Sequence, residues 1–152
     1  MLNGKSAIIT GSTSGIGLAI AQGLAARGVN VMINGFGDAG AIEAMRSRLE
    51  REHGIKAVYS NADMLNPPQV HSMVAQAAQL LGSVDIVVNN AGIQHVAPVH
   101  EFPLDKWDAI IAINLSSAFH AIRSALPGML GRRWGRIVNI CLLYTSPSPR
   151  DS

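Results

Sequence analysis

Short apolar runs alternate along this chain with longer stretches in which apolar residues recur at helical spacing. The runs rich in β-branched and aliphatic residues predict strands at 6–10, 29–34, 55–60, 84–90 and 135–140. The stretches between them predict helices at 15–28, 38–53, 66–81 and 103–130. Strands that alternate with helices form right-handed βαβ units. We therefore expect an α/β fold, a Rossmann-type doubly wound parallel sheet with about five strands.

The residues at the ends of two predicted helices support these helix boundaries. Asp38 can act as the N-cap of the second helix, and Gly54 can end that helix after His53. Asn66 followed by Pro67 is typical of an N-cap and the first helical position, which predicts the start of the third helix.

The apolar positions also predict which helix faces are buried. In the first helix, Ile16, Ile20 and Leu24 share one face, which is therefore expected to pack on the sheet. The long fourth helix has apolar residues around most of its girth, so nearly all of its sides should be covered. These residues are Trp107, Ile110, Ile111, Ile113, Leu115, Phe119, Ile122 and Leu126.

Composition and charge narrow the function classes. The 152 residues suffice for one domain, 48% are hydrophobic, and the formal net charge is only +2. This charge does not favour a nucleic acid or an anionic membrane as a partner. No apolar run reaches the length of a membrane span, and the single cysteine, Cys141, fits a reducing compartment. A cytoplasmic protein is therefore expected.

The loop after the first strand has the spacing of a phosphate-binding loop. It reads TGSTSGIG over residues 10–17 and leads directly into a predicted helix. Gly11 permits a tight turn, Gly15 lets backbone approach a pyrophosphate, and Gly17 allows the helix to pack closely on the strand. A ligand-free glycine turn is the alternative, but the position between strand and helix favours a nucleotide site.

These residues resemble the short-chain dehydrogenase/reductase family over residues 1–140. TGSTSGIG resembles its TGxxxGxG fingerprint, NNAG at 89–92 its second signature, and Asn114 its catalytic asparagine. The resemblance implies that Asp63 holds the adenine amino group. It also implies a cofactor site made by Gly11, Thr13, Ser14, Gly15, Ile16, Gly17, Phe36, Asp63, Asn90, Ala91 and Gly92.

A narrower resemblance is to bacterial D-3-hydroxybutyrate dehydrogenases. It rests on NGFGDA at 34–39, NNAGIQH at 89–95 and FPLDKWDAIIAINLSSAFH at 102–120. It implies that a small hydroxy or keto acid is the substrate, that Gln94 contacts its carboxylate, and that the intact parent is a homo-oligomer, a tetramer. From the residues alone, Gln94 is as well explained as a solvated loop amide, and His95 as a loop residue rather than a catalytic base.

The absence of positive charge near the expected adenosine site favours NAD over NADP. NADP requires a cation for its 2′-phosphate, usually in the glycine loop or after the second strand. The glycine loop holds Ser12, Thr13 and Ser14, and the end of the second strand holds Asn34, Gly35 and Phe36. None of these residues is basic, so NAD is the expected cofactor, with Phe36 as a wall beside the adenosine.

The catalytic set that the resemblance implies is incomplete within these 152 residues. The family uses a serine, a tyrosine, and a lysine four positions after that tyrosine, whose charge lowers the pKa of the phenol. Here Tyr59 is followed at that spacing by Asp63 and Tyr144 by Ser148, and no lysine follows Lys106. Cys141 and Leu142 stand where the serine is expected.

The last twelve residues, CLLYTSPSPRDS, do not resemble any part of the family. We therefore expect residues 1–140 to be the N-terminal part of an NAD-binding domain that lacks its C-terminal half, and 141–152 to be a non-native, disordered tail. Poor solubility or a partly molten state is expected for such a chain.

Two other functions stay open. The first is a 3-oxoacyl-carrier-protein reductase-like enzyme, for which an NADP-binding cation would be expected. The second is a nucleotide-binding module without catalysis, which would bind NAD without turnover. Arg132, Arg133 and Arg136 around Trp134 are typical of a basic helix-to-strand loop rather than a nucleic-acid site. The scattered histidines lack metal-ligand spacing, so no metal site is expected.

Overall fold

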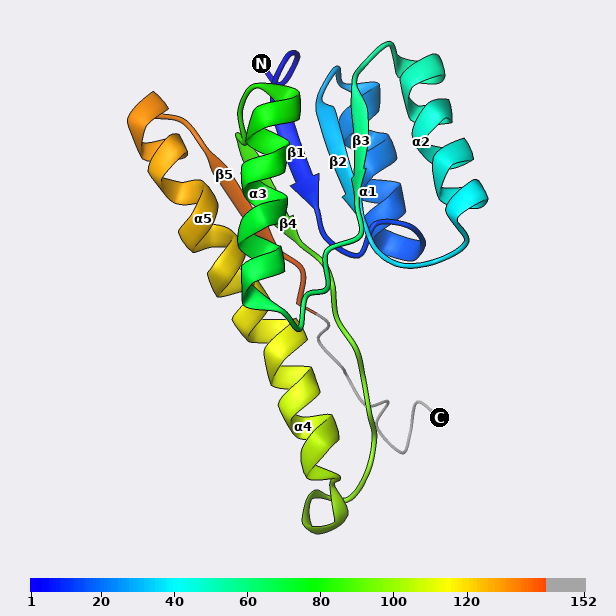
Figure 1. Cartoon of the computed structure of the whole chain (residues 1–152), viewed down its shortest axis with the longest axis vertical. Helices are drawn as coiled ribbons and strands as arrows, with labels where there is room; N and C mark the ends of the chain where they lie inside the picture. Colours follow the sequence, from blue (N-terminus) through cyan, green and yellow to red (C-terminus); the bar gives the residue numbers. More distant parts are fainter. Residues whose placement is uncertain (142–152) are drawn as a thin grey trace, which may run out of the picture.

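The computed structural model describes residues 1–141 and contains one five-stranded parallel sheet (Figure 1). The strand order is β3-β2-β1-β4-β5, so the chain crosses from one side of β1 to the other after β3. The strands are β1 (Ser6–Ile9), β2 (Asn30–Asn34), β3 (Ala57–Ser60), β4 (Ile86–Asn89) and β5 (Arg136–Asn139). This confirms the expected doubly wound α/β fold.

Helices cover both faces of the sheet. They are α1 (Gly15–Ala26), α2 (Ala39–His53), α3 (Pro67–Leu81), α4 (Leu104–Ile111) and α5 (Ser117–Arg132). Short helical turns lie at Val99–Glu101 and Ala112–Ser116. One face of the sheet is covered by α1 and α2, and the other by α3, which contacts β1, β2 and β3, and by α5, which contacts β4 (Figure 1).

The strands are apolar on both faces because each face packs on helices. Ile8, Met32 and Val87 belong to the cluster formed with α3 and α5. Their neighbours in sequence point the other way, so that Ile9 and Ile33 belong to the cluster formed with α1. Continuous apolar strands of this kind are typical of a parallel sheet covered on two sides.

The helix limits agree with the expected caps. The Asp38 carboxylate accepts a hydrogen bond from the Ala41 N–H (2.8 Å), and the Asn66 side chain accepts one from the Gln69 N–H (3.1 Å). Gly54 follows α2 in the left-handed conformation, with φ at 66°. Local sequence therefore determines where these two helices begin.

The buried face of α1 differs from the expected one. Gly17, Ala21 and Ala25 are buried, whereas the side chain of Ile16 is 56% exposed. Small residues on the inner face let the helix backbone approach the sheet closely, and the larger aliphatic residues are displaced to the flanks. The expectation therefore holds for Ile20 and Leu24, which pack against the core cluster from the flanks, and is wrong for Ile16. Hydrophobic spacing missed the small buried residues because it weights large side chains over small ones.

The long helix predicted at 103–130 is interrupted by a π-helical turn at Ala112–Ser116, between α4 and α5. An 18-residue window within the combined segment Leu104–Arg132 has a mean hydropathy of 1.3, so the segment is long and apolar enough to cross a membrane. One such helix is weak evidence for a span, because core helices of soluble proteins meet the same criterion. Here α5 packs against α3 and β4.

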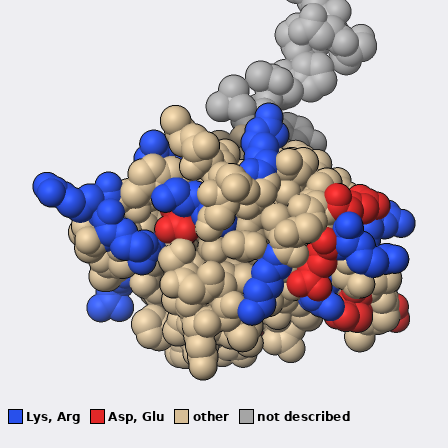
Figure 2. Space-filling view, turned by 90° about the horizontal axis from the view of Figure 1, so that it is seen from above, with Lys and Arg blue, Asp and Glu red and all other residues tan. Residues whose placement is uncertain are grey.

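Charged residues are unevenly distributed over the amino-terminal end of the sheet, which faces the viewer in Figure 2. Acidic and basic residues are interleaved on the α2 side, and basic residues predominate on the α5 side. The Arg132 guanidinium pairs with buried Asp85 (3.4 Å) and donates to the Val84 carbonyl. Lys5 and Arg136 both lie over the Trp134 ring. These contacts give much of the arginine-rich loop a structural role.

Candidate functional site

The glycine loop between β1 and α1 lies against the loop that follows β4, at the carboxyl edge of the sheet. Gly11 has φ at +60°, and a Cβ atom there would lie 3.0 Å from the Ala91 Cα. A Cβ atom at Gly17 would collide with the Gly11 carbonyl oxygen and come within 2.5 Å of the Asn90 Nδ2. The two signature loops therefore pack so closely that glycine is required at both positions.

Hydrogen bonds from side chains fix the two loops together. The Thr10 hydroxyl oxygen accepts bonds from the N–H groups of Asn90 (3.0 Å) and Ala91 (2.9 Å). The Asn90 amide donates in turn to the carbonyls of Thr10 (3.2 Å) and Gly11 (3.0 Å). In this geometry the Asn90 side chain supports the glycine loop.

A second polar residue joins the ends of three strands. Asn34 is buried; its amide nitrogen donates to the carbonyls of Ser60 and Ala62, and its amide oxygen accepts from the Gly11 N–H. Its backbone N–H donates to the hydroxyl of buried Ser12. Sequence reasoning considered Asn34 and Ser12 only as uncharged residues. A polar residue at the end of an apolar strand was the signal in the sequence that could have predicted this buried hydrogen-bonding role.

The N-terminus of α1 is available to an anion. Ser14 is its N-cap residue but makes no capping bond with its side chain, whereas side chains cap α2 and α3. A Cβ atom at Gly15 would meet nothing within 4 Å, so the backbone there faces open space. An exposed helix N-terminus beside bare backbone fits the pyrophosphate of a dinucleotide.

The loop between β2 and α2 holds Phe36 in solvent. The side chain of Phe36 is 67% exposed. The Thr13 hydroxyl donates to the Phe36 carbonyl (3.2 Å), which joins this loop to the glycine loop. Thr13 and Phe36, both expected at the cofactor site, are thus neighbours.

Asp63 lies after β3 in a tight turn. One oxygen of its carboxylate accepts from the Leu65 N–H (2.9 Å), and its own N–H donates to the Gln69 side chain (2.8 Å). The turn holds the carboxylate at the carboxyl end of β3, two strands away from β1. This position agrees with a role at the far end of a nucleotide.

A cavity of about 630 Å³ lies beside the nucleotide loops. It is lined by the β4 loop, by Ile16 of α1, by the π-helical region and by the end of β5. Six of the expected site residues meet there: Ile16, Asn90, Ala91, Gly92, Gln94 and Asn114. The lining does not include Gly11, Thr13, Ser14, Gly15, Gly17, Phe36 or Asp63, so the expected site divides into a cavity part and a nucleotide-loop part.

Asn114 holds the loop after β4 in place. Its amide oxygen accepts from the Ile93 N–H (2.9 Å), and its amide nitrogen donates to the Ile93 carbonyl (3.0 Å). Asn114 lies within the π-helical turn, and such turns are frequent at functional sites. The side chain therefore fixes the cavity wall next to Gln94.

The titratable groups of the cavity lining are few. Within residues 1–141 they are His95, whose ring packs edge-to-face on Phe102 (5.4 Å), and Cys141, which follows β5. No cluster of three histidine, cysteine or acidic side chains that could hold a metal ion is found in that part of the chain. Tyr144, Ser146, Ser148 and the rest of the expected tail lie outside the described residues.

Comparison with known proteins gives one family. A family model described as short chain dehydrogenase matches residues 5–147. A D-beta-hydroxybutyrate dehydrogenase from Cupriavidus necator is 55% identical over 140 residues, covering 92% of this chain and 54% of the relative. The chain spans about half the length of the curated relatives that it matches first.

Solved structures give the same fold. A xylitol dehydrogenase with bound NAD⁺ superposes with a TM-score of 0.81 at 31% identity, covering 90% of this chain and 52% of the other. A blue fluorescent protein from a metagenomic library, in complex with NADPH, has a TM-score of 0.77 at 39% identity, with 83% and 51% covered. Nicotinamide dinucleotides are thus bound by proteins of this architecture.

Proposed function

This chain belongs to the short-chain dehydrogenase family, and we propose that it is the nucleotide-binding part of an NAD-dependent oxidoreductase. The proposed reaction interconverts D-3-hydroxybutyrate and acetoacetate by hydride transfer. The substrate assignment is supported by the 55% identity to a D-beta-hydroxybutyrate dehydrogenase. The observation that carries the proposal is the open α1 N-terminus next to a cavity that contains Gln94 and Asn114.

The residues present fit a dinucleotide. The backbone of Ser14 and Gly15 would hold the pyrophosphate at the start of α1, where the helix dipole favours negative charge. Phe36 and Asp63 would contact the adenosine. The cavity beside Ile16 and Gly92 would receive the nicotinamide, which supplies the hydride acceptor when bound.

The proposed preference for NAD is supported by the lack of a basic residue directly after β2 and by the position of the cations of α2 and β3. The loop after β2 contains no basic residue. Arg46 of α2 is bound to Glu43, Glu50 and the Ala57 carbonyl, and Lys56 donates to the Leu80 carbonyl. Both cations are thus held at the amino-terminal end of β3, away from the loop after β2 where the 2′-phosphate of NADP would lie.

The cavity suits a small carboxylic acid. Gln94 can donate its amide N–H to a carboxylate, while the Asn114–Ile93 bonds hold the loop that carries it. His95 on the same loop is a second polar group at the lining. Aliphatic residues such as Ile110 and Ile113 complete the wall and limit water around the substrate carbon.

Turnover needs groups that these 152 residues do not contain. No tyrosine here is followed by a lysine at the fourth position, so the proton of the substrate hydroxyl has no phenolate to accept it. We therefore expect this chain by itself to bind NADH and to oxidise no substrate. The C-terminal half of a longer parent, a cytoplasmic homo-oligomer, would supply the missing set.

The binding test separates this proposal from its alternatives. The chain is titrated with NADH and with NADPH, and binding is followed by calorimetry. NADH should bind at least about tenfold more tightly, a free-energy difference of about 1.4 kcal/mol. Equal or tighter binding of NADPH would favour a 3-oxoacyl-carrier-protein reductase-like enzyme, and the absence of binding would overturn the proposal.

The substrate is tested on the parent gene. The source DNA is read across the codons for residues 140–152 and, if the frame continues into a serine and a YxxxK pair, that protein is assayed with D-3-hydroxybutyrate and NAD⁺. Changing Gln94→Ala should raise KM for hydroxybutyrate and leave KM for NAD⁺ unchanged. If the stop is genuine, a nucleotide-binding module without catalysis becomes the better assignment.

A further inference from the structure

The loop between β2 and α2 is held by hydroxyl groups that come from two other segments. The Tyr59 hydroxyl on β3 donates to the Gly35 carbonyl (2.5 Å). The Thr13 hydroxyl in the glycine loop donates to the next carbonyl, that of Phe36 (3.2 Å). Two successive carbonyl groups are therefore fixed from opposite sides.

The loop itself does not determine its own conformation. Gly35 and Gly37 both have φ at +152°, a region that glycine enters readily and other residues rarely do. A Cβ atom at Gly35 would come within 2.5 Å of the Thr13 Oγ1, so the loop and Thr13 lie in close contact. Because glycine backbone is permissive, external hydrogen bonds must select the observed path.

The residue carried by this loop is exposed and aromatic. Phe36 stands between the two glycines and is 67% exposed, although its ring is apolar. Tyr59, in contrast, is half-buried and packs against the apolar cluster between the sheet and α1–α2. The Tyr59 ring, which packs on the core, thus places its hydroxyl against the loop that exposes the Phe36 ring to solvent.

We propose that Tyr59 is a positioning residue for the adenosine half of the cofactor and acts through Phe36. This inference rests on the proposed nicotinamide-dinucleotide function. The Tyr59 hydroxyl holds the Gly35 carbonyl, and this holds the Phe36 ring where it can lie along the adenosine. Preorganisation of this kind lowers the entropy lost when the nucleotide binds.

A double-mutant cycle on the chain tests this inference. Tyr59→Phe, Phe36→Ala and the double variant are titrated with NADH and with ADP-ribose, which shares the adenosine but lacks the nicotinamide. Tyr59→Phe keeps the packed ring and removes one hydrogen bond, so it should weaken both ligands equally, by about fivefold. In the Phe36→Ala background the same change should have no further effect.

The double-mutant cycle can overturn the proposed role of Tyr59 in two ways. An undiminished effect of Tyr59→Phe in the Phe36→Ala background, or no effect in the unaltered background, overturns the inference. If the unaltered chain binds neither ligand, the proposed function fails first. Ser124→Ala, which removes a hydroxyl bonded to His71 between α3 and α5, is the matched control and should leave both affinities unchanged. Should Tyr59→Phe melt at a lower temperature, the titrations are made well below that temperature, where the variant is folded.

Discussion

Thr10, Asn34 and Asn90 direct their side-chain hydrogen bonds to the backbone of neighbouring loops. Each lies at or next to the carboxyl end of a strand, where the sheet ladder stops and backbone groups need new partners. They give the loops a fixed shape before any ligand arrives. At the scale of single residues, the site is thus built by polar groups that support its loops and by glycines that allow the loops to touch.

The close contact at Gly17 predicts a large effect of one methyl group. Gly17→Ala should destabilise the chain by about 1–3 kcal/mol, because the added Cβ collides with the Gly11 carbonyl. Gly23→Ala in the same helix is the matched control, since its Cβ would meet nothing within 4 Å. That change should stabilise by about 0.5–1 kcal/mol. Urea unfolding of the two variants measures both effects, and equal stabilities would contradict the packing argument.

The proposed role of Asp63 predicts a preference for a purine with an amino group. The unaltered chain should bind deamino-NADH, in which a carbonyl replaces that amino group, about fivefold less tightly than NADH. Asp63→Asn can still accept from the Leu65 N–H, so its turn should persist. The discrimination between the two nucleotides should shrink in this variant. Competition binding measures the ratio, and an unchanged ratio would remove Asp63 from the adenine site.

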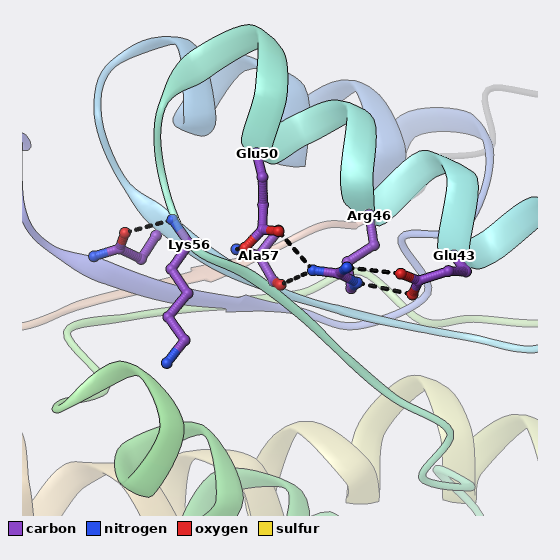
Figure 3. Close-up of polar contacts among 6 residues, drawn as sticks. Glu43, Arg46, Glu50, Lys56 and Ala57 are labelled. Atoms are coloured by element: carbon purple, nitrogen blue, oxygen red, sulfur yellow. Dashed lines mark hydrogen bonds and ion pairs between the residues drawn. The ribbon is translucent and has the colours of Figure 1, made fainter.

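At the scale of elements, α2 is joined to the outer strand β3 by three charged residues (Figure 3). Arg46 binds Glu43 and Glu50 and donates to the Ala57 carbonyl (2.9 Å), while Glu50 accepts from the Ala57 N–H (3.1 Å). The charged pair therefore satisfies both backbone groups of one residue at an exposed sheet edge. Edge groups satisfied in this way are not available to another strand.

This cluster predicts an acid-dependent loss of stability. The Ala57 N–H, together with Arg46, lowers the pKa of Glu50 from its ordinary value. A glutamate whose pKa is lower in the folded state stabilises the fold at pH values above its unfolded pKa of about 4.3. This stabilisation is lost as the pH falls through the lowered pKa of the folded state. Glu50→Gln should therefore cost up to about 1 kcal/mol at neutral pH and less in acid.

Unfolding at several pH values measures the difference between the unaltered chain and Glu50→Gln. The control is Glu52→Gln on the same helix, whose carboxylate lies 3.7 Å from Arg48. Glu52→Gln should change the free energy of unfolding only slightly, because it removes an exposed ion pair and no hydrogen bond to the backbone of β3. If the loss of unfolding free energy in Glu50→Gln stayed constant down to strongly acidic pH, the stabilising role given to the ionised Glu50 carboxylate would be contradicted.

At the scale of the whole molecule, α4, α5 and β5 leave large apolar side chains exposed. Trp107, Phe119 and Leu130 of α4 and α5 are 55%, 59% and 68% exposed. All four residues of β5 are exposed as well. The sequence predicted a helix covered on nearly all sides, and within residues 1–141 only the face of α5 that contains Ala121, Ala125 and Met129 is buried. Large apolar side chains exposed on neighbouring elements are typical of surfaces that contact other protein.

We expect the isolated chain to associate as its concentration rises. Replacing Phe119 and Leu130 with glutamate should shift the chain toward monomer, because the exposed face then carries charge. Sedimentation velocity over a range of concentrations measures the distribution. A monomer with cooperative unfolding at all concentrations would contradict both this expectation and the expected partly molten state.

The sequence by itself determined the order of elements, the caps at Asp38 and Asn66, and the position of the glycine loop. These features depend on local hydrogen bonds and on periodicity, which neighbouring residues fully specify. Tertiary structure decided the rest. It buried the small face of α1 rather than Ile16, joined Asn34 to the glycine loop and to the end of β3, and placed the Tyr59 hydroxyl against the Gly35 carbonyl. Such contacts link residues more than twenty positions apart, so only the folded sheet brings them within hydrogen-bond distance.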